Sequence, residues 1–316
     1  MDATISVERI EEAAGVIDPA FLDTPQFDCE PISEKLGVTT ILKVECVNPI
    51  RSFKGRGTDY LLHRLPADAM PIVCASAGNF GQGMAYACRK ARRNLTVFAA
   101  TTASPVKVDR MRALGAHVVL EGADFDEAKD AAMRHAADQD AMYVEDGRLG
   151  PIAEGAGTIA RELTTRSEPF SAIFVPVGNG SLVNGIGTWL KRTSPVTRVI
   201  AVCPAAAPAT ELSLKAGGPV TAPAATIADG ISVRVPIPEA LDVMRGVVDE
   251  VILVTDDEIV DAMRMLFVDA GVIVEPAGAA GLAAIAKGRA ELAGQRVVTP
   301  LTGANLTMQQ IRDWLL

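Results

Sequence analysis

The sequence predicts an α/β protein with two open, twisted, mainly parallel sheets flanked by helices, and a binding site in the cleft between two lobes. Short β-branched runs alternate with alanine-rich helical stretches throughout the 316 residues, which is the pattern of parallel sheets covered by helices. Four glycine-rich turns follow predicted strands, and in open parallel sheets ligands bind at that edge. We expect a small lobe over residues 67–148 and a large lobe over residues 1–66 and 149–316.

The individual elements follow from strand-forming runs and from helix boundary signals. Strands are predicted over residues 40–44, 72–75, 96–100, 117–120, 141–144, 172–177, 198–202, 250–254 and 295–300. Helices are predicted over residues 53–64, 80–92, 105–114, 125–137, 154–165, 182–191, 256–270 and 277–287, with an amphipathic helix in residues 1–17 and a closing helix at 307–316. Most of them begin at Gly, Ser, Asp or Pro and end near Gly or a basic residue. Residues 204–228 are rich in Pro and Gly, so we expect an irregular surface excursion there.

Composition and charge narrow the class of partner. The chain has 30 Lys and Arg against 39 Asp and Glu, a formal net charge of −9, which argues against nucleic acid and anionic membranes as partners. No uncharged run reaches the roughly 18 to 20 residues that span a bilayer, and the N-terminus has no signal-peptide core. The five cysteines form no CxxC pair, which argues against a disulfide framework or a zinc site. We expect a cytoplasmic protein that binds a small molecule.

Lys54 lies where the extended, Pro-containing segment 48–53 gives way to a predicted helix. A lysine held at such a junction suits the covalent anchoring of an aldehyde cofactor, because its amine can be aimed into a crevice. An ordinary exposed lysine is the alternative.

The glycine-rich turns have the composition of ligand-binding loops. The first spans residues 76–83, and the second, residues 178–182, leads directly into a helix. Backbone amides at a helix N-terminus favour an anion, so a phosphate is the expected occupant of the second turn. The third and fourth turns span residues 274–279 and 301–305. Neither a Walker lysine nor the Rossmann glycine spacing is present, so a tight turn without a ligand is the alternative at each.

The order of these motifs is more specific than any one of them. SFKGRG, SAGNFGQG, GNGSL, EPAGA and TGAN follow one another along the chain. This series resembles the fold type II pyridoxal-phosphate enzymes, the tryptophan synthase β-subunit superfamily, and within it the serine/threonine dehydratase group. The resemblance runs from Thr24 to Asn305.

The resemblance implies a role for each matching residue. Lys54 would be the catalytic residue, forming a Schiff base with pyridoxal 5'-phosphate and then removing the substrate Cα proton. The other expected cofactor-binding residues are Phe53, Asn79 at the phenolic oxygen, Gly178, Asn179, Gly180, Ser181 and Leu182 at the phosphate, Glu275, and Thr302 at the pyridine nitrogen. The substrate carboxylate would be bound by Ser76, Ala77, Gly78 and Asn79.

Several residues bear on the reaction and the substrate. A hydroxyl such as that of Thr302 makes the ring a weaker electron sink than a carboxylate would, which favours loss of a group from Cβ. Ala77 replaces the serine that serine racemases use as a second acid/base, so racemisation is disfavoured. Residues 203–209 carry no carboxylate where some relatives bind a divalent cation, so no metal site is expected. Arg51 or Arg148 could pair with a second substrate carboxylate, although a surface salt bridge is favoured.

The predicted function is therefore pyridoxal-phosphate-dependent β-elimination of a 3-hydroxy amino acid such as L-threonine or L-serine, giving a 2-oxo acid and ammonia. One alternative is a β-replacement synthase of the cysteine-synthase type, and another is a non-catalytic protein that kept the fold. The intact Lys54 and Asn79 argue against the second alternative. By resemblance, we expect a homodimer.

Overall fold

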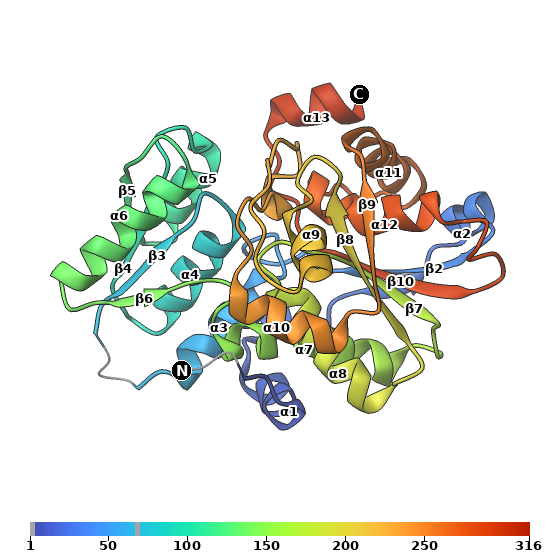
Figure 1. Ribbon diagram of the computed structural model, residues 1–316, viewed down its shortest axis with the longest axis horizontal. Coiled ribbons are helices and arrows are strands. Elements are labelled where there is room, and N and C mark those ends of the chain that lie inside the picture. The colour runs from blue at the N-terminus through green and yellow to red at the C-terminus, as the bar shows by residue number, and fades with distance from the viewer. Residues whose placement is uncertain (1–3, 67–69) are drawn as a thin grey trace.

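The computed structural model describes residues 4–66 and 70–316, and it contains two separate sheets (Figure 1). The larger sheet has six strands in the order β1-β2-β10-β7-β8-β9, and the smaller has four in the order β5-β4-β3-β6. Every strand pair is parallel except β1 with β2. The predicted fold class is confirmed. The start of the expected N-terminal helix, residues 1–3, and the expected domain boundary at residue 67 lie outside the described residues.

The strands are β1 (Gln26–Asp28), β2 (Thr39–Val44), β3 (Ile72–Ala75), β4 (Leu95–Ala99), β5 (His117–Leu120), β6 (Met142–Val144), β7 (Ala172–Pro176), β8 (Arg198–Pro204), β9 (Glu250–Val254) and β10 (Arg296–Leu301). The helices are α1 (Val7–Val16), α2 (Glu30–Leu36), α3 (Lys54–Arg64), α4 (Asn79–Lys90), α5 (Pro105–Ala113), α6 (Phe125–Asp138), α7 (Gly150–Arg166), α8 (Ser181–Thr193), α9 (Ala209–Ala216), α10 (Pro238–Val247), α11 (Asp256–Asp269), α12 (Pro276–Lys287) and α13 (Met308–Leu315). Two short 3₁₀ helices are η1 (Pro19–Phe21) and η2 (Asp229–Ile231).

The larger sheet is covered on both faces, as its nearly continuous apolar strands require. Along β7 the burial alternates between the two sides. Phe174 packs in the core formed with α2, α11 and α12, while Ile173 and Val175 pack in the core formed with α1, α7, α8 and α10. The smaller sheet carries α4, α5 and α6, and it forms the left half of the molecule in Figure 1. The carboxyl ends of β3 and β6 in one sheet and of β7 and β10 in the other border a common cavity.

Most predicted elements are present, but the sequence missed β1, α2 and α10. The expectation of an irregular surface excursion at residues 204–228 holds for residues 217–228 but was wrong for residues 209–216, which form α9. Ala209 and Ser213 of α9 are fully buried, and the Ser213 hydroxyl hydrogen-bonds the Ala209 carbonyl. Tertiary packing and local hydrogen bonds therefore compensate for a composition that disfavours regular structure.

A buried ionic network joins α3 to the large sheet and to α7. The guanidinium of Arg56, which is fully buried, donates to Glu45, the residue after β2, and to Glu162 on α7 at 2.6 to 3.0 Å. The amine of Lys43 donates to the same Glu162 at 2.5 Å. Burial alone would raise the pKa of Glu162, but Arg56 and Lys43 instead lower it to about 2. Arg56 is only two residues beyond Lys54, so the network anchors the start of α3.

All five cysteines are free and buried. Burial raises the pKa of Cys46 to about 11 and those of Cys88 and Cys203 to about 12, and it also raises that of Cys74. Among the residues that the structure describes, no helix has both the length and the apolar character needed to cross a membrane.

Candidate active site

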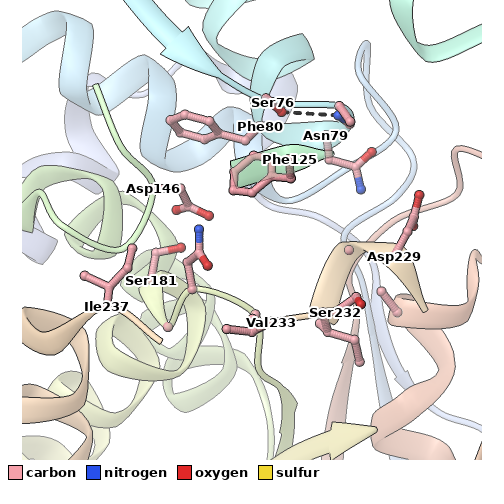
Figure 2. Close-up of a pocket in the computed structure, with 18 of the residues that line it drawn as sticks. Ser76, Asn79, Phe80, Phe125, Asp146, Ser181, Asp229, Ser232, Val233 and Ile237 are labelled. Carbon is pink, nitrogen blue, oxygen red and sulfur yellow. Dashed lines mark hydrogen bonds between the residues drawn. The ribbon is translucent and has the colours of Figure 1, made fainter. Parts of the chain in front are cut away.

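A cavity of about 630 Å³ lies where the carboxyl ends of the two sheets face each other (Figure 2). Every residue predicted from the sequence to bind cofactor or substrate lines it: Phe53, Lys54, Ser76, Ala77, Gly78, Asn79, Gly178, Asn179, Gly180, Ser181, Leu182, Glu275 and Thr302. The fold thus brings together Lys54 and four turns, the most distant of which, at Thr302, lies 248 residues beyond Lys54 in sequence. Cavities of this size commonly hold cofactors and small substrates.

Lys54 is held by the turn that follows β10. The backbone amide of Phe53 donates to the Thr302 carbonyl at 3.1 Å, and Ser52 forms an isolated bridge with Gly303. The Lys54 amide donates to the Ser52 hydroxyl at 3.3 Å, and α3 begins at Lys54. These contacts fix the backbone from which the lysine side chain enters the cavity.

The amine of Lys54 ends beside a carboxylate and a hydroxyl. Its Nζ lies 2.5 Å from Oδ2 of Asp146 and 3.4 Å from Oγ of Ser181. The Lys54 side chain is 14% exposed, and that of Asp146 is 9% exposed. Asp146 is not among the site residues predicted from the sequence. The available signal was its position just after a predicted strand, the same edge at which the glycine-rich turns occur.

The turn at residues 178–182 has the geometry of an anion-binding site. Gly180 has a φ of +95°, and α8 begins at the next residue. A Cβ atom added at Gly180 would lie 2.3 Å from Cε of Met244, and one added at Gly178 would lie 2.8 Å from the Gly230 carbonyl oxygen. The positive φ of Gly180 and the close backbone approach at Gly178 favour glycine at these positions, and the unpaired amides at the N-terminus of a helix suit an anion.

The loop at residues 76–79 is shaped by the Ser76 hydroxyl. Its oxygen accepts hydrogen bonds from the backbone amides of Gly78 at 3.2 Å and Gly81 at 2.9 Å. The Ser76 amide is used by the sheet, where it donates to the Phe98 carbonyl. For the amides of Ala77 and Asn79 we find no acceptor within the described ranges, so they are the donors that this loop offers to an anion.

Asn79 belongs to a network around a buried carboxylate. Its Nδ2 donates to Oε1 of Glu275 at 2.5 Å, while its Oδ1 accepts from Nδ2 of Asn305 at 2.7 Å. The backbone amide of Asn305 donates to the other oxygen of Glu275 at 3.0 Å. Burial raises the pKa of Glu275, which Lys107, Asn79 and Asn305 only partly offset.

Charged side chains also connect the two sides of the cavity. Lys107 on α5 pairs with Asp229, and Asp126 on α6 pairs with Arg234. Arg148 lines the cavity but pairs with Glu145 at 3.3 Å and Glu239 at 3.1 Å, whereas Arg51 is not among the lining residues.

No cluster of three or more His, Cys, Asp or Glu with metal-binding geometry occurs in the parts of the chain that the structure describes.

The donor set fits pyridoxal phosphate. The cofactor presents an aldehyde, a phenolic oxygen, a ring nitrogen and a phosphate, and the cavity offers a lysine amine, the Asn79 amide, the Thr302 hydroxyl and the glycine turn at the start of α8. Gly178 and Gly180 carry no side chain on this turn, and Gly180 has a positive φ, as a backbone cradle for a phosphate requires. Fold and site together define an enzyme that holds an aldehyde cofactor by its phosphate.

Comparison with known proteins agrees with this class. The family profile of the pyridoxal-phosphate dependent enzymes matches residues 17–303. The chain is 36% identical over 282 residues to the L-threonine ammonia-lyase of Geobacter sulfurreducens, covering 88% of this chain and 70% of that protein. It is 36% identical to the biosynthetic L-threonine dehydratase of Pasteurella multocida, covering 92% of this chain but only 57% of that protein. The processed threonine deaminase isoform 2 of Solanum lycopersicum superposes with a TM-score of 0.90 at 28% identity, over 99% of this chain and 95% of that one. The chain therefore belongs to the family of pyridoxal-phosphate dependent enzymes.

Proposed function

We propose that this protein is a pyridoxal-phosphate-dependent ammonia-lyase that converts a 3-hydroxy amino acid, such as L-threonine or L-serine, into a 2-oxo acid and ammonia. The observation that carries the proposal is the nearly buried Lys54 amine, which enters a cavity bordered by an anion-binding turn. The similarity to threonine ammonia-lyase and threonine dehydratases supports it.

The cofactor, when bound, withdraws electrons from the substrate Cα and so acidifies the Cα proton. Lys54 would hold the cofactor covalently through its amine, and that amine, once free, would take the Cα proton. The amides of residues 178–182 would hold the phosphate, and the Asn79 side chain would donate to the phenolic oxygen. The Thr302 hydroxyl would serve the ring nitrogen, and the loop at residues 76–79 would bind the substrate carboxylate.

The reaction type follows from two residues that line the cavity with Lys54, Thr302 and Ala77. Thr302 supplies a neutral hydroxyl where a carboxylate would stabilise a long-lived carbanion, so loss of the β-hydroxyl is favoured. Ala77 has no proton to give or take, so racemisation is disfavoured. β-Replacement is the alternative, and release of 2-oxo acid without a second nucleophile distinguishes elimination from it.

We propose a substrate with a single carboxylate. Arg148 is already paired with two glutamates, and Arg51 does not line the cavity. A 3-hydroxyaspartate-like substrate would therefore lack a free cationic partner at either position. A 2-oxo acid assay across a panel of 3-substituted amino acids tests this choice.

The first prediction concerns Lys54. We expect Lys54→Ala to lose at least the 10²-fold that a general base typically contributes, and to lose borohydride-reducible attachment of the cofactor. The measurements are 2-oxo acid formation and the mass of the reduced protein. Normal turnover, or cofactor still bound covalently after the substitution, would contradict the assignment.

We also propose a homodimer. Val268 on α11 and Met308 on α13 are exposed apolar side chains on two helices that pack together. Contiguous exposed apolar surface commonly marks an interface, and members of the family that the sequence resembles are commonly dimers. A monomer in light scattering at micromolar concentration would contradict this proposal. The cytoplasmic location stays a prediction of the sequence.

A further inference from the structure

We propose that Asp146 is a second catalytic residue, which receives the proton that Lys54 removes from the substrate Cα and delivers it to the departing β-hydroxyl group. This inference rests on the proposed elimination. Neither the motif series nor the family resemblance draws attention to Asp146.

The position of the carboxylate is the first argument. Asp146 follows β6 at the carboxyl edge of the smaller sheet, and its Oδ2 lies 2.5 Å from the Lys54 amine, within direct proton-transfer distance. Figure 2 shows the carboxylate at the cavity wall near Ser181, whose hydroxyl also contacts that amine. The Lys54 amine and the Asp146 carboxylate therefore lie on the same side of the cavity.

The other carboxylate oxygen of Asp146, Oδ1, also indicates a functional role. Oδ1 of Asp146 is buried and has no hydrogen-bond partner among the described residues. Only 9% of the Asp146 side chain is exposed, so solvent does not readily supply one. A buried carboxylate oxygen without a partner costs free energy, so such groups mark functional positions. An aspartate that served only to neutralise Lys54 would gain from a second donor at this oxygen.

The backbone holds this carboxylate in place. Gly147 has a φ of +88°, and a Cβ added there would lie 2.2 Å from the Asn179 carbonyl oxygen. The segment that carries Asp146 is thus pressed directly against the turn at residues 178–182. Its distance from the phosphate turn is therefore fixed by backbone contact, which gives the carboxylate the defined position that general acid catalysis requires.

The proton balance needs no outside reagent. Lys54 Nζ takes the Cα proton, and the electron pair of the Cα–H bond becomes the second bond between Cα and Cβ. The Cβ–O bond breaks with its pair on oxygen. The proton passes from Lys54 Nζ to Oδ2 of Asp146, and the protonated carboxyl then gives it to the departing oxygen, which leaves as water. Lys54 ends as a neutral amine and Asp146 as a carboxylate.

The test compares leaving groups in Asp146→Asn, which keeps the size of the side chain. L-Serine needs a proton on its leaving hydroxyl, whereas 3-chloro-L-alanine releases chloride without one. We expect turnover of serine to fall by roughly 10²-fold or more, the usual contribution of a general acid, while 3-chloroalanine is eliminated close to the wild-type rate. In deuterated water, recovered serine should exchange its Cα proton, because Lys54 still works as a base.

A further readout does not depend on turnover. Borohydride reduction of Asp146→Asn should still attach the cofactor to Lys54 in full stoichiometry, measured by mass. The matched control is Asp124→Asn. Asp124 also lines the cavity but caps α6, a role that asparagine fills equally well, so both substrates should react as in the wild type.

The outcomes separate the two proposals. If the wild-type protein eliminates neither substrate, the proposed function fails. If the wild type eliminates both but Asp146→Asn loses serine and 3-chloroalanine equally, or loses Cα exchange, Asp146 only positions Lys54 and the inference is overturned. Incomplete attachment of the cofactor would overturn it as well.

Discussion

The orientation of the Asn79 side-chain amide is determined by its neighbours. Its nitrogen faces a carboxylate acceptor on Glu275 and its oxygen faces the amide donor of Asn305, so reversing the side-chain amide would place like groups together. One hydrogen on Nδ2 is used by Glu275, and the second is the one that the proposed role of Asn79 assigns to the phenolic oxygen of the cofactor. Under that proposal, Glu275 acts through Asn79 as a positioning residue.

This arrangement makes Glu275→Gln informative. The glutamine NH₂ must face either the Asn79 nitrogen or the Asn305 backbone amide, both of which are donors. We expect the cofactor to bind about ten-fold more weakly, or ~1.4 kcal/mol, which is the scale of one lost buried hydrogen bond. The measurement is a fluorescence titration of the apoprotein with cofactor. Glu34→Gln, an exposed position on α2, removes the same charge and should leave this affinity unchanged.

At the scale of the element, the start of α8 depends on Gly180. In Gly180→Ala, the Cβ would meet Met244 and the backbone would be held at positive φ. We expect cofactor affinity to fall by more than ten-fold, together with a loss of stability of about 1–3 kcal/mol. Chemical denaturation and cofactor titration measure the two effects.

Gly217→Ala is the control for backbone strain alone. Gly217 also has a positive φ, of +73°, at the end of α9, but a Cβ there has no neighbour within 4 Å. This variant should lose about 1–2 kcal/mol of stability and retain normal cofactor affinity. Equal cofactor affinities in the two variants would contradict the assigned role of the α8 turn.

How far the sequence predicts each element depends on where its stability originates. β3, β5 and β9 are β-branched runs bounded by turn signals, and their predicted limits agree with the structure. β1 has only three residues, and it forms because β2 offers a free edge. For the site, motif order located Lys54 and the four glycine-rich turns but not the lining segments 124–129, 143–146 and 232–238. Asp146 meets Lys54 across 92 residues, and no local pattern encodes that contact.

At the scale of the whole molecule, Arg56 links the helix that begins at Lys54 to β2 and α7. We expect Arg56→Met to cost about 3–5 kcal/mol, because it leaves Glu45 and Glu162 charged, buried and without the guanidinium. Arg64→Met, on the same helix but partly exposed and paired with Glu12 at 3.3 Å, should cost under about 1 kcal/mol.

The same network predicts a pH dependence. The folded pKa of Glu162 is about 2, below its ordinary value of 4.5, so its ion pairs contribute their full stability above pH 4.5 and lose it as the pH falls toward 2. Urea unfolding across this range should show that loss in the wild type and a smaller loss in Arg56→Met. An equal acid dependence in both proteins would mean that Arg56 does not set the pKa of Glu162.

The buried cysteines can report local opening of the folded chain, because their thiols are protected from reagents while the chain stays folded. Cys74 lies in β3 of the four-stranded sheet and Cys203 in β8 of the six-stranded sheet, and both are held as unreactive thiols. Alkylation of either thiol requires its surroundings to open, so the labelling rate at each position measures the free energy of opening there. Because the two thiols lie in different sheets, mass-resolved alkylation can determine which sheet opens first, without any engineered probe.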